Sequence, residues 1–403
     1  MKNYEKYAEL IVKVGINIKK NQTLVISSPI ECNDFVRLVT KKAYEFGARE
    51  VILRWDDEIS EKIRYDMAPD EIFDEFPQWI VDMYNITAEK DAAYLTIFAS
   101  DPELLKDLDP KRISRQNKVR NIALKDYRER KMSLKNAWCI VSIPTDSWAK
   151  KVFSGKENAK ELLWDSIYKA VRVDKDNPVE EWKKHQEIMK EKIDFLNEAK
   201  FKYLKYSNSI GTDFIVELPK GHYWAGSGSK TPLGQEFVAN MPTEEVFTLP
   251  KLDGINGKVY SSMPLNYNGN LIKNFNFTFK DGLVVEYFAE EGYETLKEML
   301  ESDEGAKRLG EVALVPYDSP ISNQNILFFN TLLDENASCH LALGKAYPMI
   351  DGAKKMDSEM MRERGINDSL IHVDFMIGTK DLDIIGVKEN GEEVQLFKNG
   401  NWA

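Results

Sequence analysis

The sequence predicts an α/β N-terminal domain with a mostly parallel sheet, followed by a β-rich α+β C-terminal domain. Over about the first 150 residues, short apolar runs alternate with helical patterns. A helical pattern then covers residues 159–200, and alternating apolar and polar residues with turn sequences fill the rest of the chain. Because 403 residues exceed one ordinary domain, we expect two domains, at 1–200 and 201–403, with a long connecting helix at the end of the first.

Helices and strands are expected to alternate in the first domain. Tyr7, Leu10, Ile11 and Val14 recur at helical spacing, and an apolar run ending in Ser-Pro follows at 23–27. Further strands are expected at 51–53, 94–98 and 138–143, and a helix that ends at Gly47 precedes the first of them. Strands that are separated by helices of this length are typical of a parallel sheet.

The pattern after residue 200 is typical of antiparallel β-structure. Phe214, Val216 and Leu218 alternate with polar residues, as expected for a strand with one buried face. Further strands are expected at 272–279 and 283–288, joined by the turn Lys280-Asp281-Gly282, and at 384–387 and 394–397, joined by Asn390-Gly391. The last two strands are expected to form a terminal hairpin.

The overall charge argues against a general affinity for nucleic acid or anionic membranes. The net charge is −11 and the pI is near 5.2, so the averaged field repels phosphate groups. Residues 111–135 are basic instead, with ten Lys or Arg against two acidic residues. They are expected to form either a solvated helical surface that packs near an acidic neighbour or an anion or partner site. The charged N-terminus and the absence of a long apolar stretch predict a soluble cytoplasmic protein.

Two ionisable residues share one face of a predicted strand near the C-terminus. Residues 371–377 read as a strand, and a period of two places His372 and Asp374 on the same side. Burying two ionisable groups costs several kcal/mol unless they pair or bind a metal. From the spacing alone, a His-Asp hydrogen bond and a metal site are equally compatible with this strand.

A second histidine lies in a stretch that reads as a helix. Helical spacing would place His340, Gly344 and Tyr347 on one face, with the phenol near whatever the imidazole holds. On its own this pattern is more typical of an ordinary packed helix than of a site.

Carboxylates border two strand-like runs in the same half of the chain. Glu311 precedes one run, and the adjacent pair Glu244 and Glu245 precedes the other. Neighbours on a strand face opposite ways, so only one of the pair is expected in a common site, and spacing does not say which. Three carboxylates and two imidazoles without a thiolate suit Zn, Co, Mn or Mg, and a shared carboxylate can bridge two ions about 3.5 to 4 Å apart.

Four sequence blocks resemble the thermophilic metalloaminopeptidase family, of the aminopeptidase T and aminopeptidase S type. They lie in order at 240–248, 310–316, 331–344 and 372–378, and the resemblance extends over the full length. It implies a catalytic C-terminal domain, a homodimer that encloses the active sites and two divalent metal ions per subunit. Carried onto matching positions, the family's metal ligands become Glu245, Glu311, His340, His372 and Asp374, with Glu311 as the bridge and Tyr347 as a nearby phenol. The choice of Glu245 over Glu244 rests on the family pattern alone.

The expected function is therefore that of a metal-dependent aminopeptidase, which removes the N-terminal residue of small peptides with a metal-activated water. Glu244 or Glu311 would carry the proton from the water to the leaving amine, and Tyr347 would donate a hydrogen bond to the oxyanion. Two alternatives stay open: a metallohydrolase that cleaves a non-peptide amide or ester, and a non-catalytic protein with a structural metal site.

Overall fold

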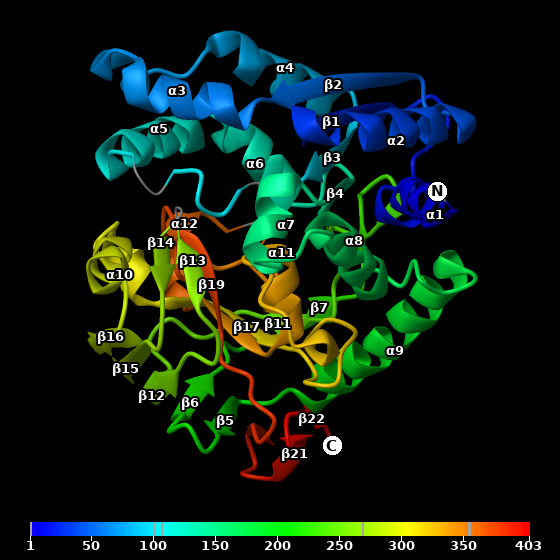
Figure 1. Cartoon of the computed structure of the whole chain (residues 1–403). Coiled ribbons are helices and arrows are strands. Elements are labelled where there is room, and N and C mark those ends of the chain that lie inside the picture. The colour runs from blue at the N-terminus through cyan, green and yellow to red at the C-terminus, as the bar shows by residue number, and fades with distance from the viewer. Residues whose placement is uncertain (1, 100, 106–107, 268–269, 354–355) are drawn as a thin grey trace. The chain divides into compact units, whose positions relative to one another are not determined.

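A parallel five-stranded sheet organises the N-terminal part of the chain. In the computed structural model, which describes residues 2–99, 101–105, 108–267, 270–353 and 356–403, its order is β10-β4-β3-β1-β2 (Figure 1). Every neighbouring pair is parallel, so the prediction of an α/β N-terminal fold is confirmed. The strands are β1 (Thr23–Pro29), β2 (Glu50–Asp56), β3 (Ala93–Ile97), β4 (Trp138–Val141) and β10 (Asn240–Met241).

Helices cover this sheet, as expected for β-α-β connections. Tyr84 of α4 and Tyr127 of α6 stack with ring centroids 4.5 Å apart and pack against Tyr94 of β3. The helices of this part are α1 (Lys2–Leu10), α2 (Asn33–Glu45), α3 (Glu58–Met67), α4 (Gln78–Glu89), α5 (Pro110–Ala123), α6 (Lys125–Met132), α7 (Asp146–Val152), α8 (Ala159–Ala170) and α9 (Pro178–Ala199).

The basic residues 111–135 form α5 and α6. Arg112 and Arg115 pair with the carboxylates of Asp70 and Asp74, which belong to the short helix Asp70–Asp74. Part of the positive charge is thus matched by an acidic neighbour.

The expected single helix over 159–200 is wrong, because α8 and α9 are separate. Arg172 has a positive φ of 60° between them, a conformation that ends a helix. Pro178 then begins α9, where the missing N–H of a proline costs nothing.

The chain divides into two units, one of residues 1–186 and 228–242 and the other of residues 187–227 and 243–403. This division differs from the expected boundary at residue 200, because it falls inside α9 and because segment 228–242 returns to the first unit. Gln235 holds this segment by donating to the carbonyl of Ile16 and to the side chain of Gln22. Segment 228–242 also contains β8 (Ser229–Lys230), β9 (Glu236–Phe237) and β10.

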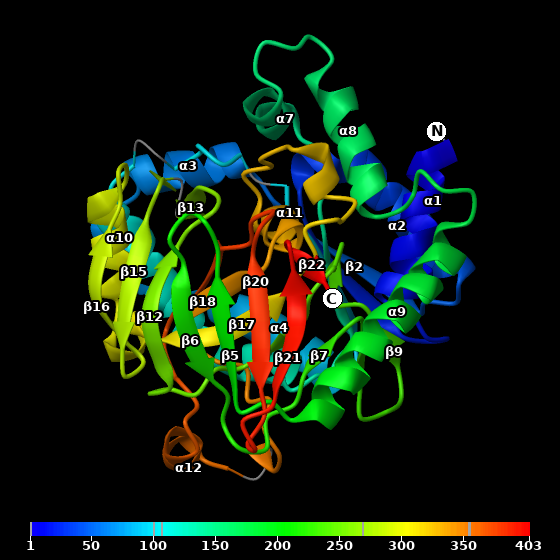
Figure 2. The same ribbon diagram turned by 90° about the horizontal axis from the view of Figure 1, so that it is seen from below.

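Two multi-stranded antiparallel sheets and one two-stranded sheet build the second unit, which confirms the predicted β-rich C-terminal fold. The larger sheet has the order β16-β15-β12-β6-β5-β20-β21-β22, seen face on in Figure 2. Its strands are β5 (Tyr203–Ser207), β6 (Asp213–Glu217), β12 (Ile255–Tyr260), β15 (Asn276–Lys280), β16 (Leu283–Phe288), β20 (Asp383–Val387), β21 (Glu393–Lys398) and β22 (Asn401–Trp402). The expected terminal hairpin is formed by β20 and β21.

The smaller sheet carries the residues that matter for function, in the order β19-β18-β17-β11-β7. Phe214 and Phe277 of the larger sheet share one apolar core with Leu341 and Phe375 of the smaller sheet. The strands are β7 (Ala225–Gly226), β11 (Val246–Thr248), β17 (Leu309–Leu314), β18 (His340–Gly344) and β19 (His372–Met376), and the unit also contains β13 (Leu265–Tyr267), β14 (Asn270–Ile272), α10 (Tyr293–Leu300), α11 (Thr331–Asp334) and α12 (Ser358–Glu363).

The expected helix around His340 is wrong. His340–Gly344 is a strand, β18, that lies between β17 and β19. Leucine and alanine favour helices in isolation, but both neighbouring strands supply hydrogen bonds here and all five residues are buried. Tertiary packing therefore overrides local propensity, and the i, i+4, i+7 relation of His340, Gly344 and Tyr347 does not exist.

No helix in the described ranges is both long enough and apolar enough to cross a membrane.

Candidate metal centre

Strand register brings four of the sequence-predicted site residues to one face of the smaller sheet. Glu311 of β17 lies opposite Ala342 of β18, and Ala342 lies opposite Asp374 of β19. His340 and His372 are two residues away from Ala342 and Asp374 along their strands, so they share that face. The alternate residues point into the core between the two sheets.

Small residues leave room above this face. Ala342 separates Glu311 from Asp374, and Gly344 lies opposite His372. Gly344 has a φ of 99°, and a Cβ there would overlap the carbonyl oxygen of Ile371. Only glycine fits this position without strain. The part of the sheet face between the ionisable residues is therefore formed by Ala342 and Gly344, whose small size leaves room for the ionisable side chains to meet.

The fifth predicted ligand, Glu245, reaches the same cluster from the segment that precedes β11. Its Oε2 lies 3.1 Å from Nε2 of His340. Glu311 lies between the two histidines: Oε1 is 3.8 Å from Nε2 of His340, and Oε2 is 3.5 Å from Nε2 of His372. Oδ1 of Asp374 is 3.5 Å from the same His372 atom. Two groups of three possible ligands result, and Glu311 belongs to both.

Backbone carbonyls orient both imidazoles toward the carboxylates. Nδ1 of His340 lies 3.1 Å from the carbonyl oxygen of Ser338, and Nδ1 of His372 lies 2.7 Å from that of Lys345. A carbonyl can only accept, so each Nδ1 carries the proton that it donates. Each Nε2 of a neutral ring then directs its lone pair at the cluster, which is how metal-binding histidines are commonly held.

The residues fit divalent cations in both their donor atoms and their charge. Three carboxylates and two imidazoles suit borderline to hard ions. Among the described residues, no Lys or Arg forms an ion pair with Glu245, Glu311 or Asp374. Oδ1 of Asp374 is buried and, although it lies near His372, accepts no well-formed hydrogen bond. Buried negative charge without a cation is costly, so the cluster needs positive charge from a source other than Lys or Arg.

Without a metal, protons supply this positive charge. Burial disfavours the charged ring of His372, but the carboxylates of Asp374 and Glu311 outweigh this effect and raise its pKa to about 10. Burial likewise opposes charge on His340, yet Glu245 and Glu311 raise its pKa well above the usual value. Burial also raises the pKa of Glu311, despite the two histidines. The same field that attracts protons attracts divalent cations.

The stability gained from metal binding should therefore increase with pH. A folded-state pKa of about 10 for His372, against 6.5 ordinarily, means that its charged form stabilises the metal-free protein below pH 6.5 and that this contribution disappears as the pH rises through about 10. A bound ion replaces the proton and binds more tightly as protons leave. We expect the difference in Tm between metal-loaded and chelated protein to widen from pH 6.5 to pH 10, as measured by calorimetry. A difference that narrows over this range would contradict the assignment.

The structure adds Glu335, which the sequence did not single out, to the surroundings of the cluster. Glu335 begins the short helix Glu335–Ala337 and is only 8% exposed. Burial raises its pKa well above the usual value, and the negative charges of Asp374 and Glu245 raise it further. In the sequence, Asp334-Glu335 resembles an exposed acidic pair. Its position five residues before His340 was the only available signal.

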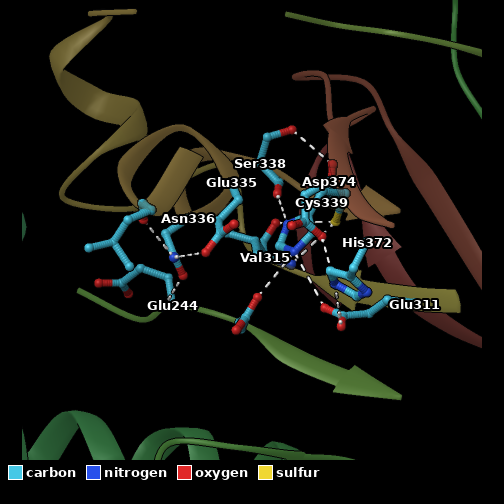
Figure 3. A network of polar contacts seen from close by, with 12 residues as sticks. Glu244, Glu311, Val315, Glu335, Asn336, Ser338, Cys339, His372 and Asp374 are labelled. Carbon is cyan, nitrogen blue, oxygen red and sulfur yellow. Dashed lines mark hydrogen bonds and ion pairs between the residues drawn. The ribbon is translucent and has the colours of Figure 1, made fainter. Parts of the chain in front are cut away.

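Tyr347 and Glu244 are both expected to act beside the metal ligands. Tyr347 lies against one candidate ligand, whereas the side chain of Glu244 points away from the cluster (Figure 3). The ring of Tyr347 meets that of His372 edge to face, with centroids 5.5 Å apart. Burial, followed by the charges of Glu311 and Asp374, raises the pKa of Tyr347, so the phenol keeps its proton and can donate it in a hydrogen bond. Glu244 is buried, but Figure 3 shows its side chain directed away from Glu311 and His372.

Comparisons with known proteins show which proteins this chain is similar to. The family described as thermophilic metalloprotease (M29) matches residues 1–402. The chain is 49% identical over 405 residues to aminopeptidase 2 of Geobacillus stearothermophilus, covering 100% of this chain and 98% of the relative. It is 49% identical over 400 residues to aminopeptidase AmpS of Bacillus subtilis, covering 98% and 97%. The structure of wild-type AmpT from Thermus thermophilus is similar with a TM-score of 0.93 and 38% identity, covering 100% of this chain and 99% of that one.

Proposed function

The chain belongs to the thermophilic metalloprotease (M29) family and is a metal-dependent aminopeptidase. On this premise we propose that its candidate ligands would hold two divalent ions, with Glu311 as a ligand of both. The ions would supply the activated water for release of the N-terminal residue. One observation carries the proposal: Glu311 directs one carboxylate oxygen at each of two separate histidines. A carboxylate shared in this way is the usual bridge of a two-metal hydrolytic site. Glu245 and His340 would complete one ion's ligands, and His372 and Asp374 the other's.

Bound ions would supply Lewis acidity and lower the pKa of a coordinated water. The side chains would divide the remaining work. Glu335 is the best-supported proton carrier, because it is buried beside the cluster and belongs to neither ligand group. It would take the proton from the attacking water and deliver it to the leaving amine. Glu311 is less suited, since both of its oxygens face histidines, and Glu244 points elsewhere.

Tyr347 would stabilise the oxyanion. Its phenol keeps its proton at neutral pH and lies beside His372, so it can donate a hydrogen bond where negative charge develops on the carbonyl oxygen. Preorganised donors of this kind act strongly in a buried site, because they need no reorganisation during the reaction.

The proposed substrates are small peptides with a free N-terminus. A neutral α-amine can bind a divalent ion held at this centre, whereas an acetylated amine cannot. Zn, Co, Mn and Mg are all compatible with these ligands. We further propose that the protein is cytoplasmic and forms a homodimer. Sedimentation equilibrium tests the homodimer directly.

Aminopeptidase activity should depend reversibly on metal. We expect release of the chromophore from a leucine anilide to fall at least about a hundredfold after chelation, on the scale of losing a metal-held nucleophile, and to return when Zn, Co or Mn is added. The same anilide with an acetylated amine is the matched control and should be cleaved poorly at every stage.

The outcome separates the alternatives. Cleavage of blocked and free substrates at equal rates would point to a hydrolase that does not recognise an N-terminus. Melting of the second unit on chelation, with no activity before it, would point to a structural metal site. No turnover by folded, metal-loaded protein would overturn the proposal.

A further inference from the structure

A buried asparagine connects the segments that bear two of the site's carboxylates. Asn336 lies in the short helix Glu335–Ala337 and is completely buried. Its Oδ1 accepts a hydrogen bond of 2.7 Å from the backbone N–H of Glu244. Its Nδ2 donates to the carbonyl oxygen of Leu332 at 2.9 Å and lies 3.4 Å from Oε1 of Glu335. Figure 3 shows Asn336 between Glu244 and Glu335.

This connection matters because Glu245 differs from the other candidate ligands. Glu311, His340, His372 and Asp374 lie within strands, where the hydrogen-bond ladder fixes their backbone. Glu245 precedes β11 and lies outside any strand. Val246, which pairs with β17 and β7, fixes the backbone of Glu245 on the C-terminal side. On the N-terminal side, Asn336 accepts a hydrogen bond from the N–H of Glu244.

We propose that Asn336 is a positioning residue that holds Glu245 and Glu335 in register with the rest of the metal centre. The inference rests on the proposed function of that centre. Asn336 touches no reacting atom; it acts through the backbone of Glu244 and the carboxylate of Glu335. An amide is suited to this task because it accepts from an N–H and donates to a carbonyl and a carboxylate at once. Aspartate keeps the acceptor but loses the donors, and alanine loses both.

The predicted defect is selective for one metal. Outer hydrogen-bond partners typically contribute 10- to 100-fold to metal affinity. We expect Asn336→Ala to weaken the ion held by Glu245 and His340 by about 10- to 100-fold and to leave the ion held by His372 and Asp374 nearly unchanged. The kcat should fall while KM changes little, because Glu335 is also displaced. Asn336→Asp should keep the hydrogen bond from Glu244 but place a second negative charge beside Glu335. Its kcat should therefore fall by a larger factor than its metal affinity.

The matched control is Asn136→Ala in the first unit. Asn136 is also buried, and its Nδ2 donates to the carbonyl oxygens of Ala88 and Ala92 at 2.9 and 3.0 Å. Both alanine variants should lower the Tm of chelated protein, but the control should keep both metal affinities and kcat. Affinities are measured by competition with a chromophoric chelator at a temperature where every variant is folded.

Two results would overturn the proposal. One is a folded Asn336→Ala variant with both metal affinities and kcat at wild-type values. The other is that Asn336→Ala and Asn136→Ala weaken the affinity for both ions by the same factor. If Asn336→Ala does not fold, the isosteric Asn336→Asp decides, and an unchanged kcat in that variant overturns the proposal. Failure of the proposed function is recognised separately, because wild-type protein that binds two ions without cleaving peptides still yields the affinity comparison.

Discussion

Replacing Glu311 with glutamine is expected to lower kcat/KM by about a thousandfold or more and to remove most of the bound metal. Glu311 is the only residue that belongs to both ligand groups among the described residues. Glutamine offers one acceptor oxygen and an NH2 group that cannot bind a cation, so it can serve one histidine's ion but not both. Even outer partners of metal ligands contribute 10- to 100-fold to affinity, and loss of one stabilising group at the reacting atoms costs roughly 10²–10³ in kcat.

Metal content and activity should be measured on the same Glu311→Gln sample. The control is Glu304→Gln, since Glu304 is exposed and pairs with Arg362 at 3.0 Å. It should keep its metal and its activity, because surface ion pairs contribute about 0–1 kcal/mol. Two ions retained per subunit in Glu311→Gln, with near-normal turnover, would exclude Glu311 as the bridge.

Replacing Glu335 with glutamine should separate catalysis from metal binding. We expect kcat to fall by about 10²–10⁴, the usual contribution of general acid–base catalysis, while both ions remain bound. Glutamine has nearly the same shape as glutamate but cannot accept the proton of the attacking water. Glu335 belongs to neither ligand group, so its charge is not needed to hold an ion.

The pH profile adds a specific test of this role. The pKa of Glu335 is raised above its usual value by burial and by its acidic neighbours, and a general base works only when deprotonated. Bound cations lower the pKa of a nearby carboxylate, so wild-type activity should fall as the pH drops through the pKa that Glu335 has in the metal-loaded enzyme. Glu335→Gln should lose this acidic limb. A variant with normal kcat, or one that loses its metal, would refute the assignment.

Periodicity in the sequence predicted those parts of the site that lie on an isolated, regular strand. His372 and Asp374 were expected on one face of a strand, and β19 has that geometry. The parallel N-terminal sheet and the terminal hairpin were predicted for the same reason, because each strand pattern was bounded by clear turns or helices. Residue types alone also indicated divalent metals.

The sequence by itself thus determined the fold class and the carboxylate and imidazole types of the candidate metal ligands. Through the family resemblance it also indicated which residues these ligands are. Tertiary structure decided the rest. It made 340–344 a strand because two neighbours supplied its hydrogen bonds, buried Glu335, and set Asn336 against the backbone of Glu244. These are contacts between segments far apart in the chain, and local propensity and spacing carry no information about which distant segment will cover a given residue.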